Sequence, residues 1–362
     1  MTTATLGPST YEWWQHLAAR QPPARPERRT LRQLRAMDQK QLRAYHRARL
    51  DWHEAIVLRT PQVAAAYEQL DDLLDVNQGD LTRVRSAAAI DAAPSLGKST
   101  TTDTYGLRFH REQIEELGAH VDDNEDVMRI PVCRVRLTGD VTIKGLHQQL
   151  LHFYANPARR ESTGRMLARD LAAAASEAVR RHETRLIIID DIHFLHPGTE
   201  HGEKVANELK WLANEYPATF LFAGVALGSR GLLSDGLTPK QAALAQTGRR
   251  WTVLTLNPFD PLTKAGEPIW RDTLLALEQR LVLARMRPGL LADELSDYLY
   301  IRSTGVIGSL MDLIRRGASR AMRTGHETLD SNLLDQIIID IAAEAARGVT
   351  AKRVHAHRRA QS

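Results

Sequence analysis

The sequence predicts an α/β fold with a mostly parallel sheet, followed by a small all-helical subdomain. From residue 86 to residue 256, short apolar segments alternate with stretches of helical periodicity. Strands that alternate with helices are typical of a parallel sheet covered by helices on both faces. After Pro258 and Pro261 only helical patterns remain. The change of pattern therefore separates an α/β core from a helical lid.

The expected elements follow from apolar periodicity and from turn residues. Five segments are predicted to be strands of the core: Ser86–Ile90, Ile130–Leu137, Leu186–Asp190, Thr219–Val225 and Trp251–Leu256. Core helices are expected at Ile143–Tyr154, Leu167–Arg181 and Glu203–Glu215. Lid helices are expected at Trp270–Met286, Leu290–Ile301, Ile307–Arg323 and Asn332–Ala346.

The N-terminal region has a composition of its own. Four prolines among the first 29 residues predict an irregular arm, in which Trp13 and Trp14 pack on the domain or on a partner. A basic helical stretch follows from Thr30 to Leu58, and Thr60-Pro61 is typical of the start of the next helix. We expect a basic arm and helix at 1–59, the α/β core at 60–260, the lid at 261–346 and a basic tail at 347–362. The basic segments fit either nucleic-acid contacts or solvated surfaces.

Composition limits the class of protein. The chain has 362 residues, of which 43% are hydrophobic and 25% charged, with a net charge of +4. No apolar run approaches the roughly 20 residues that cross a bilayer, and the N-terminus lacks the apolar stretch of a signal peptide. Cys133 is the only cysteine, so no internal disulfide can form. These features predict a cytoplasmic protein without a membrane partner.

The strongest motif lies between the first predicted strand and the helix after it. It reads Ala92, four residues, then Gly97-Lys98-Ser99. Such a loop aims backbone N–H groups at a phosphate, the lysine bridges the β- and γ-phosphates, and the Ser99 hydroxyl ligates Mg²⁺. The stricter pattern has glycine where this chain has Ala92. The expected nucleotide-binding residues are Ala93, Pro94, Ser95, Leu96, Gly97, Lys98, Ser99 and Thr100.

A second motif supports the first. The apolar segment Leu186–Ile189 ends in Asp190 and Asp191, at the strand end that faces the ligand in an open α/β sheet. Asp190 is expected to hold the Mg²⁺ shell, and Asp191 to orient or deprotonate the attacking water. The alternative is a core strand followed by an acidic helix cap. Glutamate is usual at the second position, so the shorter Asp191 predicts slow hydrolysis or none.

Further positions are weaker candidates. Arg249 and Arg250 directly precede the fifth predicted strand, where an arginine of an oligomeric ATPase reaches a neighbour's γ-phosphate. They fit a pair of surface arginines equally well. The segment Ala223-Gly224-Val225 lacks the polar side chain that usually senses the γ-phosphate, and Ser309 is the polar residue offered by the lid helix.

In this order, the loop, acidic strand, paired arginines and helical lid resemble the AAA+ transposition ATPases of the TniB/TnsC type, relatives of IstB and phage Mu B protein. The matching segments are Ala92–Thr100, Leu186–Leu195 and the lid segment Ser303–Leu310. The resemblance spans roughly residues 30 to 346. Its departures are Ala92 for glycine, Asp191 for glutamate and the missing polar sensor at Val225.

The resemblance implies an AAA+ P-loop ATPase that uses ATP and Mg²⁺ to assemble as a ring or filament on double-stranded DNA. It also implies contacts with a DDE-type transposase and a target-selection protein. The segments that face DNA in such proteins lie between the second and third strands, and the contacts are mainly to phosphates. The candidates here are Thr142, Lys144, Arg159 and Arg160, followed by Arg165. A solvated surface is the alternative for each.

Two other functions fit the same core. One is a signalling or defence ATPase that switches protein contacts without DNA. The other is a nucleotide-binding scaffold without turnover, which the shorter Asp191 and the missing sensor favour. DNA-stimulated ATP turnover separates the first reading from both alternatives.

Overall fold

The computed structural model describes residues 9–79, 85–122, 124–137, 142–154, 166–192, 209, 211–213, 215–227 and 251–361. The chain divides into two compact units. The core unit comprises Met1–Arg20 and Gln62–Leu256, and the helical unit comprises Gln21–Pro61 and Asn257–Ser362. The N-terminal region is thus shared between the two units, with its basic stretch assigned to the helical unit.

A five-stranded parallel sheet organises the core unit. Its strands are β1 (Ala87–Ala92), β4 (Val132–Arg136), β5 (Leu186–Asp190), β6 (Thr219–Gly224) and β7 (Trp251–Leu256), arranged in the order β4-β5-β6-β1-β7. Every pairing in this sheet is parallel. The α/β fold class predicted from the alternation of strands and helices is confirmed.

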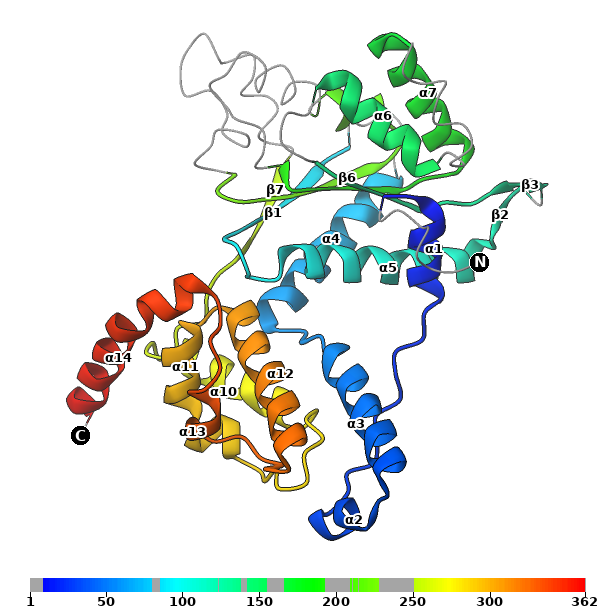
Figure 1. The fold of residues 1–362 in the computed structure, drawn as a ribbon. Helices are drawn as coiled ribbons and strands as arrows, with labels where there is room; N and C mark the ends of the chain where they lie inside the picture. The colour runs from blue at the N-terminus through cyan, green and yellow to red at the C-terminus, as the bar shows by residue number, and fades with distance from the viewer. Residues whose placement is uncertain are drawn as a thin grey trace. The chain divides into compact units, whose positions relative to one another are not determined.

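Helices cover both faces of the sheet (Figure 1). On one side lie α1 (Tyr11–Ala19), α4 (Pro61–Gly79) and α5 (Lys98–Leu117); on the other lie α6 (Ile143–Tyr154) and α7 (Ala168–Arg181). Because both faces are covered, the inner strands are largely apolar, as in β5, where Leu186–Ile189 precede Asp190 and every residue is buried. A small antiparallel pair, β2 (His120–Val121) and β3 (Asn124–Met128), follows α5 and was not expected.

The expected irregular arm contains the helix α1. Its N-cap is Thr10, whose hydroxyl accepts a hydrogen bond from the Trp13 N–H. Trp14 is fully buried beside Gly106 of α5, where a β-carbon would lie 3.1 Å from the indole ring. The expectation of an irregular segment was wrong for residues 11–19, because an aromatic side chain anchors a short capped helix on the domain.

The helical unit begins with two short basic helices, where one continuous helix was expected. They are α2 (Leu31–Ala36) and α3 (Gln39–Glu54). Thr30 and Asp38 each form a capping box with the glutamine three residues later. The cap at Asp38 starts a new helix and so explains the break after Ala36.

The rest of the helical unit comprises α10 (Gly266–Glu278), the π-helix η5 (Leu290–Glu294), α11 (Ser296–Ser303), α12 (Ile307–Thr324), α13 (Ser331–Leu334) and α14 (Ile341–Gln361). Most of the expected basic tail therefore belongs to α14. Leucines, isoleucines and methionines of these helices form one core with Trp270 and Tyr300. None of the helices in the described ranges combines the length and apolar character of a membrane-spanning helix.

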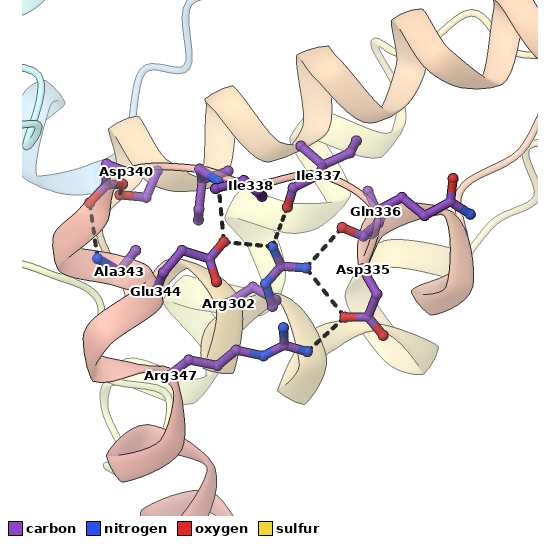
Figure 2. A network of polar contacts seen from close by, with 12 residues as sticks. Arg302, Asp335, Gln336, Ile337, Ile338, Asp340, Ala343, Glu344 and Arg347 are labelled. Atoms are coloured by element: carbon purple, nitrogen blue, oxygen red, sulfur yellow. Dashed lines mark hydrogen bonds and ion pairs between the residues drawn. The ribbon is translucent and has the colours of Figure 1, made fainter.

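Buried arginines connect distant segments of the helical unit. Arg49 of α3 makes two hydrogen bonds, of 2.7 and 2.9 Å, with the Glu327 carboxylate, and both side chains are almost fully buried. Arg302 of α11 donates to the carbonyl oxygens of Leu334 and Ile337 and to Glu344 of α14 (Figure 2). Each guanidinium thus replaces its lost hydration with several acceptors.

Candidate nucleotide-binding site

The loop between β1 and α5 has the backbone geometry of an anion cradle. Ser95 and Gly97 adopt positive φ angles of 63° and 86°. Gly97 occupies the N-cap position of α5 without a side-chain hydrogen bond to the helix. Successive N–H groups in such a turn form a concave nest, and the helix N-terminus adds positive potential. Apart from Pro94, which has no N–H, residues 93–97 therefore present backbone donors where an anion would lie.

The first turn of α5 places the polar side chains of the motif. Lys98, its first residue, is 9% exposed. The hydroxyls of Thr101 and Thr102 donate to the carbonyl oxygens of Gly97 and Ser99, at 2.9 and 3.1 Å. These two hydroxyls therefore serve the helix itself. Ser99, half-buried at the start of the helix, carries the hydroxyl that the sequence predicts as a Mg²⁺ ligand.

The two aspartates of the acidic motif lie at the end of β5. Asp190 is fully buried, and its Oδ1 accepts a 2.9 Å hydrogen bond from the N–H of Asp191. Asp191 has a φ of 63° and its side chain is 23% exposed. Because β1, β6 and β5 are parallel neighbours, the loop and both carboxylates lie at the same edge of the sheet. This is the arrangement that the two motifs predict.

Two arginines of β4, missed in the sequence analysis, face these carboxylates. Arg134 Nη2 and Arg136 Nη2 lie 3.5 and 3.6 Å from Asp190 Oδ2, and Arg136 Nε lies 3.4 Å from Asp191 Oδ2. Arg134 also makes a bidentate pair with Asp103 of α5. Burial raises the pKa of the Asp103 carboxyl, and the Arg134 guanidinium acts in the opposite direction. Arginines at alternate positions of an otherwise apolar strand were the signal that could have revealed them.

The end of β6 is closely packed beside the position where a polar sensor was sought. A β-carbon on Gly224 would lie 2.4 Å from Leu227 Cδ2 and 3.1 Å from Ile192 Cγ1. A side chain at this position would therefore have to displace Leu227. In the helical unit, the Ser309 hydroxyl donates a 2.6 Å hydrogen bond to Asp340 Oδ2. Asp340 in turn accepts from the Ala343 N–H at the start of α14, so the Ser309 hydroxyl is already engaged within its own unit.

The remaining candidates are only partly described. Thr142 is exposed just before α6, where its Oγ1 accepts from the Gly145 N–H at 2.9 Å, and Lys144 lies in the first turn of that helix. The other candidates lie outside the described residues, as does most of the expected helix Glu203–Glu215: they are Arg159, Arg160, Arg165, Arg249 and Arg250.

The donor set fits a nucleotide with its metal ion. A nest of backbone N–H groups and Lys98 suit a polyphosphate, which carries several negative charges. Carboxylate and hydroxyl oxygens, here Asp190 and Ser99, are the ligands that Mg²⁺ prefers, usually together with waters and substrate phosphates. The described residues thus offer both halves of a Mg²⁺·ATP site at one edge of the sheet.

Comparison with known proteins agrees with this geometry. Residues 81–233 match the family model of the AAA domain. Among solved structures, the ORC1 protein of Aeropyrum pernix in complex with DNA is similar, with a TM-score of 0.54 and 15% identity. The match covers 80% of this chain and 65% of the ORC1 chain. This chain thus spans slightly less than two thirds of the length of ORC1.

Two further structures have lower TM-scores. The Aeropyrum pernix ORC2 protein, solved with ADPNP and ADP, has a TM-score of 0.49 and 13% identity. That match covers 76% of this chain and 68% of the ORC2 chain. Domain III of the Thermotoga maritima replication initiation protein DnaA has a TM-score of 0.42 and 15% identity. That match covers 78% of this chain and 94% of the DnaA domain. No curated protein matches the sequence. Residues 81–233 thus match an AAA domain, and the predicted AAA+ P-loop ATPase fold is confirmed.

Proposed function

We propose that this protein is an ATPase that binds Mg²⁺·ATP at residues 93–100 and Asp190 and uses it to control its hold on double-stranded DNA. The observation that carries the ATP site is the common sheet edge shared by the loop, Lys98 and the fully buried Asp190 carboxylate. A carboxylate without solvent contact is stable as an anion only beside cations or hydrogen-bond donors. The buried Arg134, with either Arg136 or a metal ion, supplies such surroundings.

Each site residue has a role in this proposal. The backbone of 93–97 and Lys98 hold the phosphates, while Ser99 and Asp190 hold Mg²⁺, which would neutralise phosphate charge. Asp191 orients or deprotonates the attacking water. Its side chain already pairs with Arg136 and is one methylene shorter than glutamate. We therefore propose slow turnover.

The proposal of DNA binding is supported by a basic groove in the helical unit. The groove has a volume of about 550 Å³ and is bordered by α3, by α12 and by residues 336–338. Four arginines of α12 line it: Arg315, Arg316, Arg320 and Arg323. Glu54 and Asp312 are the acidic residues of the lining, so arginine charge prevails. A groove of this charge suits a phosphate backbone.

Backbone contacts hold some of these guanidinium groups in place. Arg315 donates to the carbonyl oxygens of three residues between positions 53 and 56, and Arg316 and Arg320 donate to those of Ile338 and Gln336. Arg316, Arg320 and Arg323 follow one another at helical spacing along one face of α12. Ordered guanidiniums lose less side-chain entropy when they contact phosphates. These contacts favour DNA over a purely protein-directed switch.

The finer role rests on the family resemblance. We infer that the protein is a regulator of DNA transposition that assembles as a homo-oligomer on DNA and contacts a DDE-type transposase and a target-selection protein. The same residues support one alternative, a nucleotide-binding scaffold without turnover. The ion pair between Asp191 and Arg136, together with the lack of a polar side chain in Ala223-Gly224-Val225, favours this alternative.

Retention on random double-stranded DNA tests the proposal. Purified protein is applied with and without Mg²⁺·ATP at two salt concentrations, beside Lys98→Ala and the double variant Arg320→Ala/Arg323→Ala. We expect ATP-dependent, salt-sensitive retention that Lys98→Ala abolishes. The double variant should bind ATP normally but lose retention, with the slope of log affinity against log salt reduced by about 2, since each phosphate contact contributes about 0.9.

Two outcomes would contradict the proposal. Absence of retention in every nucleotide state would remove DNA as the partner and leave a protein-directed switch. Retention without any ATP turnover, stimulated or basal, would instead support the scaffold. A separate variant, Lys144→Ala, removes a cation of the core unit and tests the DNA candidates near α6.

A further inference from the structure

The arginines of β4 differ in how firmly they are held. Arg134 is 4% exposed and makes hydrogen bonds of 3.0 and 3.2 Å with the two carboxylate oxygens of Asp103. Removing this guanidinium would leave Asp103 and Asp190 without their buried counter-charge. Arg134 is therefore a permanent part of the core unit. It connects α5, which begins at Lys98, with the Asp190 carboxylate at the end of β5.

Arg136 is held only at its tip. Its side chain is 50% exposed, and its described contacts are the ion pairs with Asp190 and Asp191, at 3.6 and 3.4 Å. Both distances exceed the 2.7–2.9 Å of a strong charge-assisted hydrogen bond by roughly 0.6 Å. A long, half-exposed side chain with such contacts can turn into solvent at little cost. Arg136 is therefore the displaceable member of the pair.

The two arginines do not balance the carboxylates they face. Asp103, Asp190 and Asp191 together carry one negative charge more than Arg134 and Arg136. An excess of carboxylates over these two arginines is compatible with a metal ion at the cluster. A divalent ion held by Asp190 would nevertheless lie close to Arg136, which contacts the same carboxylate oxygen, Oδ2. Like charges at such short range repel each other, so the arginine and the metal compete.

We propose that Arg136 competes with Mg²⁺ for the Asp190 and Asp191 carboxylates, so that the arginine must turn away before Mg²⁺·nucleotide is fully bound. Arg134 stays in place and positions Asp190. This inference rests on the proposed ATP site and describes how Mg²⁺·nucleotide binding at that site is regulated. The competition raises the Mg²⁺ concentration that nucleotide binding requires, and it makes Asp191 available only when the metal has displaced the arginine.

The test is a Mg²⁺ titration of nucleotide binding. Binding is detected through the fluorescence of a ribose-labelled ADP analogue. Arg136→Gln keeps a polar side chain and removes the charge, whereas Arg136→Lys keeps the charge. We expect Arg136→Gln to lower the half-saturating Mg²⁺ concentration about three- to ten-fold, the effect of removing one charge at roughly 6 Å in a water-like medium. Arg136→Lys should stay within about two-fold of the wild type.

Two controls isolate the effect. Arg169→Gln removes another exposed arginine of the core unit, paired with Asp170 at 3.6 Å, and should leave the Mg²⁺ titration unchanged. Thermal unfolding in EDTA checks that Arg136→Gln is folded, and nucleotide affinity in EDTA should be unchanged.

An unchanged or higher Mg²⁺ requirement in Arg136→Gln, with a normal wild-type titration, would overturn the competition. Arg136 would then contact the nucleotide or only stabilise the fold. If the wild type bound no nucleotide at any Mg²⁺ concentration, the proposed ATP site would fail first and this inference with it.

Discussion

His53 of α3 is a buried histidine that has to stay neutral. Its side chain is 2% exposed, and its Nε2 accepts a 3.0 Å hydrogen bond from the N–H of Val282, which requires an unprotonated nitrogen. Burial, and secondarily the nearby Arg49 guanidinium, lower the pKa of His53 to about 4. The unfolded chain, with the ordinary value of about 6.5, binds a proton first as the pH falls. Acid therefore destabilises the folded helical unit.

The contribution of His53 is complete above about pH 6.5 and is lost as the pH falls toward 4. Between about pH 7 and pH 5 we expect the wild type to lose about 2 kcal/mol of unfolding free energy through this residue. His53→Gln keeps a hydrogen-bond acceptor and removes the titrating group. Its loss of unfolding free energy between the two pH values should therefore be smaller than that of the wild type by about 2 kcal/mol. Urea unfolding at the two pH values measures both. His110, whose pKa burial likewise lowers to about 4, contributes equally to both proteins and cancels.

Ala92 shows why the looser form of the phosphate-loop motif is sufficient here. It is the last residue of β1, is 3% exposed and pairs with Leu256 of β7. Among the described residues, the positive φ angles of this loop belong to Ser95 and Gly97. A residue in extended backbone does not need the freedom of glycine. The departure that weakened the motif in the sequence is thus structurally neutral, whereas Gly97 occupies a backbone region that favours glycine.

Arg302 is the main connection between α11 and the start of α14. Its guanidinium donates to Leu334 O, Ile337 O and Glu344 Oε1, at 2.9, 2.6 and 3.0 Å (Figure 2). We expect Arg302→Met to cost about 3 kcal/mol, because buried carbonyl groups and a carboxylate lose their partner. Hydrogen exchange should become faster in the first turns of α14, and urea unfolding should show the loss.

The matched control lies in the same network. Arg347 pairs with Asp335 at 2.6 Å, but its side chain is 39% exposed. Exposed ion pairs contribute up to about 1 kcal/mol, so Arg347→Met should have a much smaller effect. Equal losses in the two variants would show that burial of Arg302 is not what stabilises α14.

Elements with strong periodicity could be predicted from the sequence, whereas those set by distant contacts could not. The segments Ile143–Tyr154, Leu186–Asp190 and Trp251–Leu256 were predicted with the bounds that the structure has. The expected helix Leu290–Ile301 is instead divided into η5 and α11. The carboxylate of Glu278 accepts hydrogen bonds from the N–H groups of Gly289 and Leu291, both at 2.8 Å. A cap provided by a residue eleven positions away leaves no local signal.

At the scale of the whole molecule, the sequence predicted a core followed by helices but not the composition of the helical unit. That unit includes residues 21–61, which the sequence analysis treated as a separate arm and helix. The buried pair of Arg49 and Glu327 joins residues 278 positions apart. The phosphate-loop and acidic motifs could be predicted because each is local in sequence. Arg134 and Arg136 were missed because their role depends on the pairing of β4 with β5.

The order of the strands also decides how Arg249 and Arg250 can act. Both lie outside the described residues, directly before Trp251, the first residue of β7. Trp251 pairs with Ala87 at the start of β1, whereas the phosphate loop follows Ala92 at the end of that strand. Five residues of strand correspond to about 17 Å. The beginning of β7 is therefore at the sheet edge opposite the loop. We propose that arginines directly before it act on the γ-phosphate of a neighbouring subunit.

Mixing of two inactive variants tests this trans-acting role. The variant Arg249→Ala/Arg250→Ala keeps the loop, and Lys98→Ala keeps both arginines. We expect each alone to lose at least about ten-fold in ATP turnover, given the large effect of a trans-acting arginine on phosphoryl transfer. In a mixed oligomer, the arginines of a Lys98→Ala subunit would complete the intact site of its neighbour. Turnover should therefore recover in part on mixing and pass through a maximum as the ratio is varied. Strictly additive rates, in a mixture that light scattering shows to be assembled, would place the arginines outside the catalytic interface.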